Sequence, residues 1–503
     1  MRGRRKKYIA AVLALFCFNA NILSLNTNAL SFESDAYIYD EWGKSMSAPV
    51  AYVQQSVISG SGSGTSLFTE PKALYIKNNT IYVSDTGNDR IVVLNSNYEF
   101  LYEIKEVKDA TDGNNTLKSP EGIFIDEEEN MYICDTGNHR IIKTDSDMEC
   151  LMILTKPDSD LLSDDIEFKP TKAIVNRAGN ILVVADGIYM GLVNYDSTGH
   201  FQGFFGGNRV EVTAAVVARK FWSRFSTEQQ KQSTTRSLPV EYSNIVLHND
   251  LIYAVVKSST TSVDELKKLN SLGDNVLRYN DVGLHTAKND FGDLEKIYTN
   301  GTVNDNRFSA VDVHERECIA LLDSNKGHIF VYDEECNLIF IFGNVGSDKG
   351  TLQSPVDIVH HGDNYLVLDS ASGDIKVYTP TLYAEKVTQA LEMYHDNKYT
   401  EASALFSEIL KLYSNSRFAY MGLGKASLQK GEYKDACRYF KLAGERQQYS
   451  VAFREYRKEF ISKNLWWLVV CAVVIILLLR IIIVRFRRWM GYEPRKKHKV
   501  IYH

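Results

Sequence analysis

Hydrophobic and polar positions alternate along most of the chain up to about residue 380, in short β-branched and aromatic runs separated by Asn, Asp and Gly. Such alternation predicts half-buried β-strands joined by tight turns. From Tyr383 the apolar positions recur with a period of about 3.6 residues, which predicts amphipathic helices. The run from Leu465 to Val484 is apolar except for Arg480, and its twenty residues are enough to cross a bilayer as one helix. The pattern therefore predicts a mainly β region, a helical segment and a transmembrane helix.

The β region contains a repeat. Glu70–Asn95 and Ser119–Asp145 nearly copy each other, and their aspartates Asp85 and Asp135 are fifty residues apart. The pattern within each unit predicts three strands joined by two turns. Such a unit can bury its faces only by packing against neighbouring copies. Four-stranded units packed radially form a β-propeller. Weaker copies raise the predicted number of units to six; they are Lys169–Val184, Tyr242–Val256, Phe308–Tyr332 and Ser354–Tyr378.

The ends of the repeat region predict how the propeller closes. No fourth strand follows Asp374–Tyr378 in the sixth unit, because the helical pattern begins there. Ala51–Ile58 resembles the fourth strands of the other units and precedes the first unit. We therefore expect 51–58 to complete the last blade of a propeller spanning 51–380, which would remove an exposed sheet edge.

The segments DTGNDRI and DTGNHRI, at 85–91 and 135–141, resemble the hallmark of NHL repeats, so the resemblance implies a six-bladed NHL-type β-propeller. Turn chemistry explains each residue type: aspartate accepts backbone N–H bonds, glycine permits a positive φ, and arginine ties the turn. We therefore expect structural rather than catalytic roles for these positions. They are Asp85, Gly87, Arg90, Asp135, Gly137, Arg140 and the related aspartates Asp186, Asp323 and Asp369.

The helical segment, 382–462, contains two copies offset by thirty-four residues, in which Tyr399, Ala402 and Phe406 recur as Tyr433, Ala436 and Phe440. It resembles TPR repeats, more closely in the second copy than in the first. The resemblance implies a concave face that binds a peptide or partner protein, and Tyr420 is a candidate contact. A structural stalk is the alternative, because arrays of this kind usually need three or more repeats.

The two ends of the chain predict its topology. Five basic residues, the uncharged stretch 8–25 and small residues up to Ser31 are typical of a secretory signal peptide, 1–31, with an uncleaved signal anchor as the alternative. Basic residues follow the predicted span in 485–503, which indicates a cytoplasmic tail. We therefore expect a single-pass protein of the cell membrane with its N-terminal domains outside.

Charge and cysteine content exclude several classes of function. The chain totals −6, but the first seven residues carry +5 and the residues from Arg480 onward +7, so the region between carries −18. So acidic a surface repels phosphate backbones and excludes nucleic acid as a partner. No CxxC pair occurs, so neither a zinc site nor a disulfide framework is indicated.

Between the third and fourth units lies an insert, about 206–239, with apolar residues at helical spacing. The insert could simply pack over one face of the propeller. Alternatively, it could act as a lid or as a surface that binds a partner, since loops on rigid scaffolds often carry function. The candidate partner-binding residues in it are Arg219, Lys220, Trp222 and Arg224.

Some six-bladed relatives of NHL propellers are lactonases or lyases with a divalent metal in the central channel. Such a site needs convergent carboxylates or histidines at the starts of the inner strands, for which Glu121, Asp357, His360 and His361 are weak candidates. No HExxH, GxSxG, P-loop or dinucleotide motif occurs. We therefore expect no cofactor and an extracellular binding scaffold, with a metal-dependent lactonase or lyase as the alternative.

The whole arrangement resembles bacterial exported proteins that combine an NHL propeller, TPR repeats and a membrane segment, many of which are found with carbohydrate ABC transporters. The resemblance implies a multi-pass membrane protein or transporter component as partner.

Overall fold

The computed structural model describes residues 36–40, 43–159, 162, 165–207, 241–257, 265–277, 291–294, 297–299, 302–304, 306–314, 318–348 and 350–491. The predicted signal peptide, most of the insert and the last residues of the predicted tail lie outside these ranges. The chain divides into two compact units, Met1–Thr388 and Gln389–His503.

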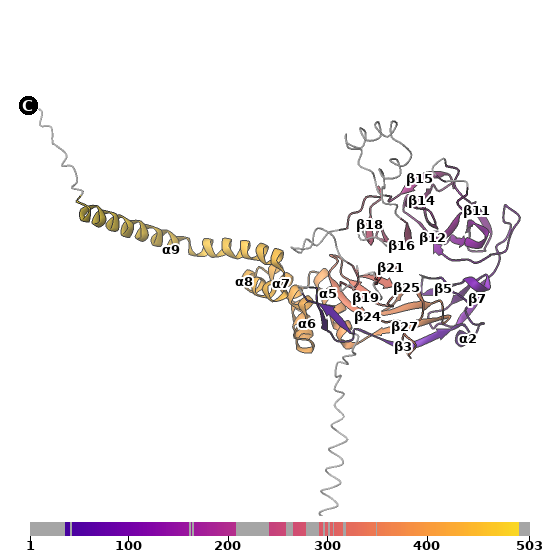
Figure 1. Cartoon of the computed structure of the whole chain (residues 1–503), viewed down its shortest axis with the longest axis horizontal. Coiled ribbons are helices and arrows are strands. Elements are labelled where there is room, and N and C mark those ends of the chain that lie inside the picture. Colours follow the sequence, from indigo (N-terminus) through magenta and orange to yellow (C-terminus); the bar gives the residue numbers. More distant parts are fainter. Residues whose placement is uncertain are drawn as a thin grey trace, which may run out of the picture. The chain divides into compact units, whose positions relative to one another are not determined.

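Antiparallel sheets form the six blades of a propeller, and consecutive strands pair in each blade except at the outer edge of the sixth (Figure 1). The first strands of the blades form the inner ring: β4 contacts β8, then β12, β16, β21 and β25 follow, and β25 contacts β4 again. This arrangement confirms the predicted fold class. The blades are β4 (Ala73–Lys77), β5 (Thr80–Asp85), β6 (Arg90–Leu94) and β7 (Phe100–Ile104); β8 (Ile123–Ile125), β9 (Met131–Asp135), β10 (Arg140–Thr144) and β11 (Cys150–Leu154); β12 (Lys169–Val175), β13 (Ile181–Asp186), β14 (Leu192–Tyr195) and β15 (Phe201–Phe205); β16 (Tyr242–His248), β17 (Leu251–Val256) and β18 (Leu266–Leu269); β21 (Phe308–Val313), β22 (Ile319–Asp323), β23 (Ile329–Tyr332) and β24 (Leu338–Phe342); and β25 (Pro355–His361), β26 (Asn364–Asp369), β27 (Asp374–Pro380) and β3 (Tyr52–Ser59).

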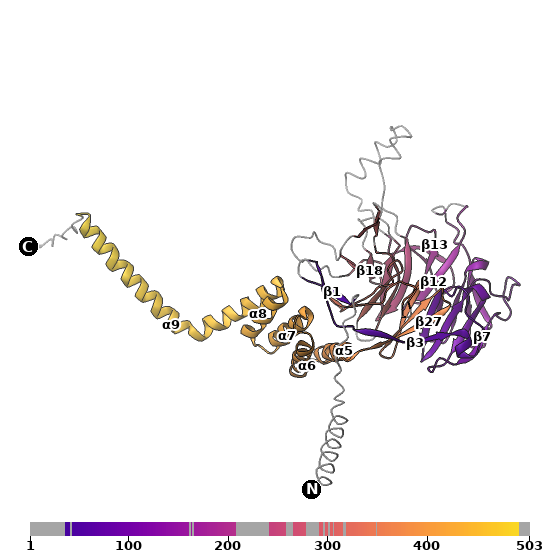
Figure 2. The same ribbon diagram turned by 60° about the horizontal axis from the view of Figure 1, so that its bottom comes forward.

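The sixth blade joins the two ends of the propeller. The N-terminal strand β3 pairs antiparallel with β27, from Ser59 opposite Asp374 to Tyr52 opposite Pro380 (Figure 2). The backbone N–H of Thr381 also donates to the carbonyl of Ala51 at 2.8 Å. The strand expected at 51–58 therefore lies in the last blade.

Apolar side chains pack between neighbouring blades. Ile58, Leu366 and Ile375 of the sixth blade form one buried cluster with Leu74, Val83 and Val92 of the first. Since these clusters join blades rather than lie within them, closing the ring buries surface that an open array would expose.

Two short hairpins lie outside the blades, β1 (Tyr37–Tyr39) with β2 (Ser45–Ser47) and β19 (Ile297–Thr299) with β20 (Thr302–Asn304). Tyr37 and Tyr39 donate hydrogen bonds to Asp293, which also accepts from Lys326 Nζ at 2.6 Å. Burial alone would raise the pKa of Asp293, but hydrogen bonds from His328, Lys326 and Tyr37 hold it well below its usual range. This ionised carboxylate ties β1 to the loop beside the fifth blade.

The helices of the second region pack in sequence, α6 on α7, α7 on α8 and α8 on α9. Two glycines of α7 allow close contact: a Cβ on Gly422 would lie 2.3 Å from the Phe406 ring, and one on Gly424 2.6 Å from the Phe440 ring. The helices are α5 (Leu382–His395), α6 (Tyr399–Leu412), α7 (Arg417–Gln429), α8 (Tyr433–Ala443) and α9 (Arg446–Trp489).

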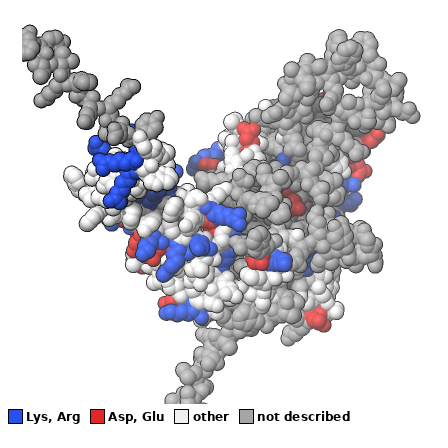
Figure 3. Space-filling model, turned by 60° about the vertical axis from the view of Figure 1, so that its left-hand side comes forward, with Lys and Arg blue, Asp and Glu red and all other residues white. Residues whose placement is uncertain are grey.

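The long helix α9 is interrupted at Asn464, whose φ of −111° and ψ of 15° are not helical. The part after this kink is apolar and exposed, and it is long enough to cross a membrane. Arg487 and Arg488 lie in its last turn, and Figure 3 shows blue side chains gathered there. The predicted apolar span is therefore a helix, and basic residues follow it.

Candidate functional site

The two complete repeat motifs form the same buried hydrogen-bond network. Asp85 accepts from the backbone N–H of Thr69 at 2.7 Å and from Arg90 Nε at 2.7 Å. Asp135 accepts in the same way from Lys118 N–H at 2.7 Å and Arg140 Nε at 2.8 Å. Both aspartates are fully buried. Each motif thus ties the loop that enters its blade to the turn between the second and third strands.

The motif also links one blade to the next. The Thr86 hydroxyl donates to the carbonyl of Pro120, at the start of the second blade, at 2.7 Å. Thr136 donates to Pro170, at the start of the third blade, at 2.6 Å. These contacts fix the position of one blade against the next, which is a structural role. Neither motif lines the pocket described below.

The interpretation of the motif glycines was wrong. Gly87 and Gly137 do not have positive φ; the positive φ belongs to Asp89 (52°) and His139 (57°). Glycine is needed instead for close approach, because a Cβ on Gly87 would lie 2.7 Å from the Thr69 carbonyl oxygen, and one on Gly137 2.7 Å from that of Lys118.

The other three motif aspartates keep progressively fewer of these hydrogen bonds. Asp369 accepts backbone N–H bonds from Gln353 and Ser354, with Lys376 3.7 Å away in place of the arginine. Asp323 accepts from the N–H of Arg307 at 3.1 Å, but its Oδ2 is buried without a hydrogen-bond partner among the described residues. Asp186 is exposed and pairs with Lys257 at 2.7 Å.

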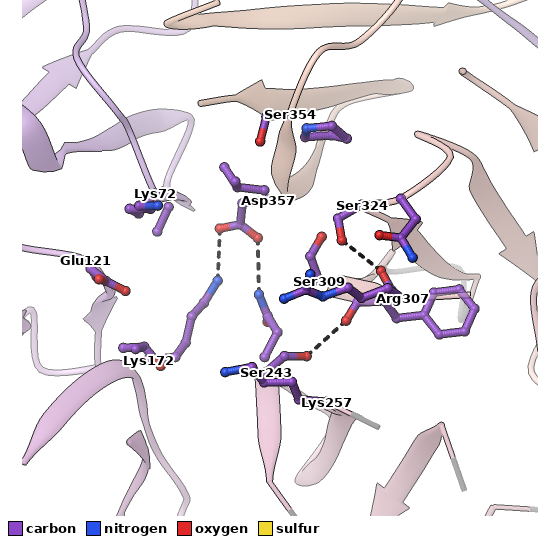
Figure 4. Close-up of a pocket in the computed structure, with 17 residues that line it drawn as sticks. Lys72, Glu121, Lys172, Ser243, Lys257, Arg307, Ser309, Ser324, Ser354 and Asp357 are labelled. Atoms are coloured by element: carbon purple, nitrogen blue, oxygen red, sulfur yellow. Dashed lines mark hydrogen bonds and ion pairs between the residues drawn. The ribbon is translucent and has the colours of Figure 1, made fainter. Parts of the chain in front are cut away.

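The starts of the inner strands surround a pocket of about 380 Å³ at one mouth of the channel (Figure 4). Every blade contributes to its lining, with Lys72, Glu121, Lys172, Asn244, Arg307 and Asp357 taken in blade order. In Figure 4, Lys72 and Glu121 lie on one side, Arg307 and Ser324 on the other, and Asp357 between them. The remaining lining is rich in serine.

Asp357 holds the inner ring together across the channel. It is 1% exposed, and its Oδ2 accepts from Lys172 Nζ at 3.0 Å and from the backbone N–H of Leu74 at 2.9 Å. Its Oδ1 accepts from Asn244 Nδ2 at 3.3 Å. The carboxylate of the sixth blade thus reaches the first, third and fourth blades. Because donors already occupy both oxygens, it is poorly placed to bind a metal ion.

The other metal candidates do not converge on Asp357. Glu121 lines the pocket, whereas His360 lies at the far end of β25, with Nδ1 2.6 Å from Asp312 Oδ2. His361 is beside Tyr98, at 3.4 Å. No group of three or more His, Cys, Asp or Glu side chains able to hold a metal occurs among the described residues. The candidate set is therefore split between the two ends of the channel.

Glu121 itself has an unusual environment. Its carboxyl is half-buried and accepts no hydrogen bond from any described residue. Burial raises the pKa of Glu121, nearby Lys72 lowers it in part, and Asp186 raises it further. A ligand that donates a hydrogen bond to the Glu121 carboxylate would therefore stabilise it.

The cations of the pocket were not among the predicted site residues, because a metal site needs carboxylates and histidines rather than lysine or arginine. Lys72 and Glu121 both follow a proline, Pro71 and Pro120, at the start of their repeat units. Aligning the units on these prolines identifies Lys72 as the counterpart of Glu121.

The predicted partner-binding residues are only partly described. Arg219, Lys220, Trp222 and Arg224 lie outside the described residues. Tyr420 lies on α7 and is half-buried.

The described part of the chain is thus a six-bladed β-propeller with a polar pocket at its channel mouth, followed by packed helices and a long apolar helix. No protein-family model and no curated protein matches the chain. Solved structures similar to it include a catalytically inactive virginiamycin B lyase from Staphylococcus aureus with quinupristin, at 11% identity and a TM-score of 0.37, covering 61% of this chain and 80% of that one. A structural genomics protein of unknown function from Bacteroides thetaiotaomicron matches at 12% identity and a TM-score of 0.42, covering 67% of this chain and 80% of that one. The extracellular domain of a hybrid two-component system from B. thetaiotaomicron matches at 11% identity and a TM-score of 0.36, covering 68% of this chain and 39% of that one.

Proposed function

We propose that this chain is a membrane-anchored binding protein that acts outside the cell and is not an enzyme. The observation that carries the proposal is the state of Asp357, the most buried acid of the channel mouth. Its oxygens accept hydrogen bonds from Lys172, Asn244 and a backbone N–H, so its role is to hold blades of the ring together. A hydrolytic metal would need those oxygens free.

The anchor is the apolar part of α9, after the kink at Asn464. The basic residues that follow it favour a cytoplasmic tail, with the propeller and the packed helices outside. The motif networks and the glycine-mediated helix contacts support assigning the two regions to NHL and TPR repeats.

The partner in this proposal is a multi-pass membrane protein or transporter component. The apolar part of α9 suits an anchor rather than a channel, because a pathway through the membrane needs polar groups facing it. The contact surface would be either the helical array around Tyr420 or the insert that contains Arg219 and Lys220.

Crosslinking in living cells, followed by recovery through a C-terminal tag and mass spectrometry, tests this function. We expect Tyr420→Ala, or charge reversal at Arg219 and Lys220, to reduce recovery of one specific membrane protein. Tyr439→Ala is the matched control, since Tyr439 is also half-buried but lies on α8. Equal recovery with all three variants would contradict the proposal.

The alternative is a metal-dependent lactonase or lyase. Only half-buried Glu121, with its raised pKa, favours it. Stoichiometric divalent metal in the purified chain, together with turnover of a lactone that Glu121→Gln abolishes, would establish this alternative instead.

A further inference from the structure

We propose that the pocket at the channel mouth binds a small carboxylate that also carries hydrogen-bond donors, such as a hydroxy acid or an amino acid. This inference deepens the proposed function and rests on the channel being a binding site rather than a catalytic one.

The cations of the pocket fall into two classes. Lys172 is committed to Asp357, and Lys257 pairs with Asp186 at 2.7 Å and Glu241 at 3.2 Å. Lys72 and Arg307, in contrast, are exposed, and their side chains form no hydrogen bond or ion pair with any described residue. They come from the first and fifth blades, on opposite sides of Asp357 in Figure 4. Two uncommitted cations facing one cavity suit an anion, which arginine and lysine bind through charge-assisted hydrogen bonds.

The floor of the pocket offers the complementary groups. Asn244 is 5% exposed; its Nδ2 donates to Asp357, but its Oδ1 is buried with no partner among the described residues. The hydrogen bond to the carboxylate fixes the orientation of this amide, so the orphaned atom is an acceptor. The Ser309 hydroxyl is also buried and unpaired in the described part of the chain. Buried polar atoms are rarely left unsatisfied, so they indicate a ligand or ordered water.

Glu121 extends the set of acceptors. Its carboxyl lines the same cavity and accepts no hydrogen bond from a described residue. A hydroxyl or ammonium group of the ligand would satisfy Glu121 and Asn244, while the ligand carboxylate meets Lys72 or Arg307. The cavity of about 380 Å³ is in the range that small molecules occupy. A ligand with only one kind of group would leave half of the pocket unpaired.

Four six-carbon probes separate these requirements: gluconate has a carboxylate and hydroxyls, norleucine a carboxylate and an ammonium, glucitol only hydroxyls, and hexanoate only a carboxylate. Each is titrated calorimetrically into the full chain in detergent micelles, with no partner present. We expect saturable one-to-one binding of gluconate or norleucine, recovered unchanged, and affinities at least about tenfold weaker for glucitol and hexanoate. The preference between gluconate and norleucine identifies the donor as hydroxyl or ammonium.

The double substitution Lys72→Gln, Arg307→Gln should weaken binding of the preferred probe by about tenfold or more, since it removes both free cations. The matched control, Lys108→Gln with Arg177→Gln, removes the same charge at exposed positions outside the pocket lining and should leave affinity unchanged. Ser309→Ala should weaken binding without lowering Tm, because it deletes an unsatisfied hydroxyl.

Failure of gluconate and norleucine to bind, equal binding by glucitol or hexanoate, or full affinity in the Lys72 and Arg307 double variant would overturn the inference. Because the titration contains no partner protein, a negative result here leaves the recovery experiment unaffected. A failed recovery experiment likewise leaves the titration unaffected.

Discussion

At the scale of single residues, stability of the propeller depends on charges that are fully removed from water. Asp135 is 0% exposed and Arg140 2%, and Arg140 also donates to the carbonyl of Thr116 at 3.2 Å. Hydrogen bonds satisfy both partners, so the pair offsets its desolvation cost. Either partner alone would be a buried charge without compensation.

Arg140→Ala should therefore lower the free energy of unfolding by about 3–5 kcal/mol, because it leaves the Asp135 carboxylate buried and unpaired. Thermal and urea unfolding of the full chain measure this loss. The control is Arg177→Ala, which removes an ion pair to Asp250 with side chains 83% and 55% exposed. Exposed pairs contribute about 0–1 kcal/mol, so equal losses in the two variants would show that the motif is not a structural tie.

At the scale of elements, ring closure by β3 is the feature on which the propeller depends most. The strand supplies Ile58 to the cluster between the sixth and first blades, and Tyr52 stacks on Phe342 with ring centroids 4.7 Å apart. Without β3, the edge of β27 would be open.

Deletion of Ala51–Ile58 should abolish cooperative unfolding and cause aggregation, since it exposes a full strand edge and opens one joint between blades. Light scattering and calorimetry would detect both effects. Replacing the exposed residues Val53 and Val57 by threonine keeps the strand and should change little. If the shortened chain melts at the unchanged temperature, closure by β3 does not stabilise the ring.

At the scale of the whole molecule, the proposed topology places residues 32–464 outside the cell and 485–503 inside. Protease added to intact cells or protoplasts should remove the propeller and spare a C-terminal tag, because the membrane shields only the tail. A tag placed after residue 40 serves as the control and should be lost under the same conditions. Loss of the C-terminal tag with protection of the N-terminal region would reverse the orientation.

The sequence by itself determined the elements whose information is local or periodic. The alternation of period two and the fifty-residue spacing of Asp85 and Asp135 predicted the blades, because strand faces and turn chemistry depend on neighbours in the chain. The missing fourth strand of the last unit also indicated the place of β3. The apolar run after Asn464 predicted the apolar helix, since length and composition decide whether a helix can span a bilayer.

Only the tertiary structure decided the chemistry of the channel. Asp357 bonds to Lys172, 185 residues away, and to Asn244, 113 residues away, so no local pattern could reveal that this carboxylate is committed. His360 follows Asp357 by only three positions in the sequence. The two residues nevertheless lie toward opposite ends of the channel, because β25 is extended between them. The fold also brings together Lys72 and Arg307, which come from the first and fifth blades and lie far apart in the sequence. A propeller site combines one short segment from each blade, and the closed ring alone determines which side chains meet.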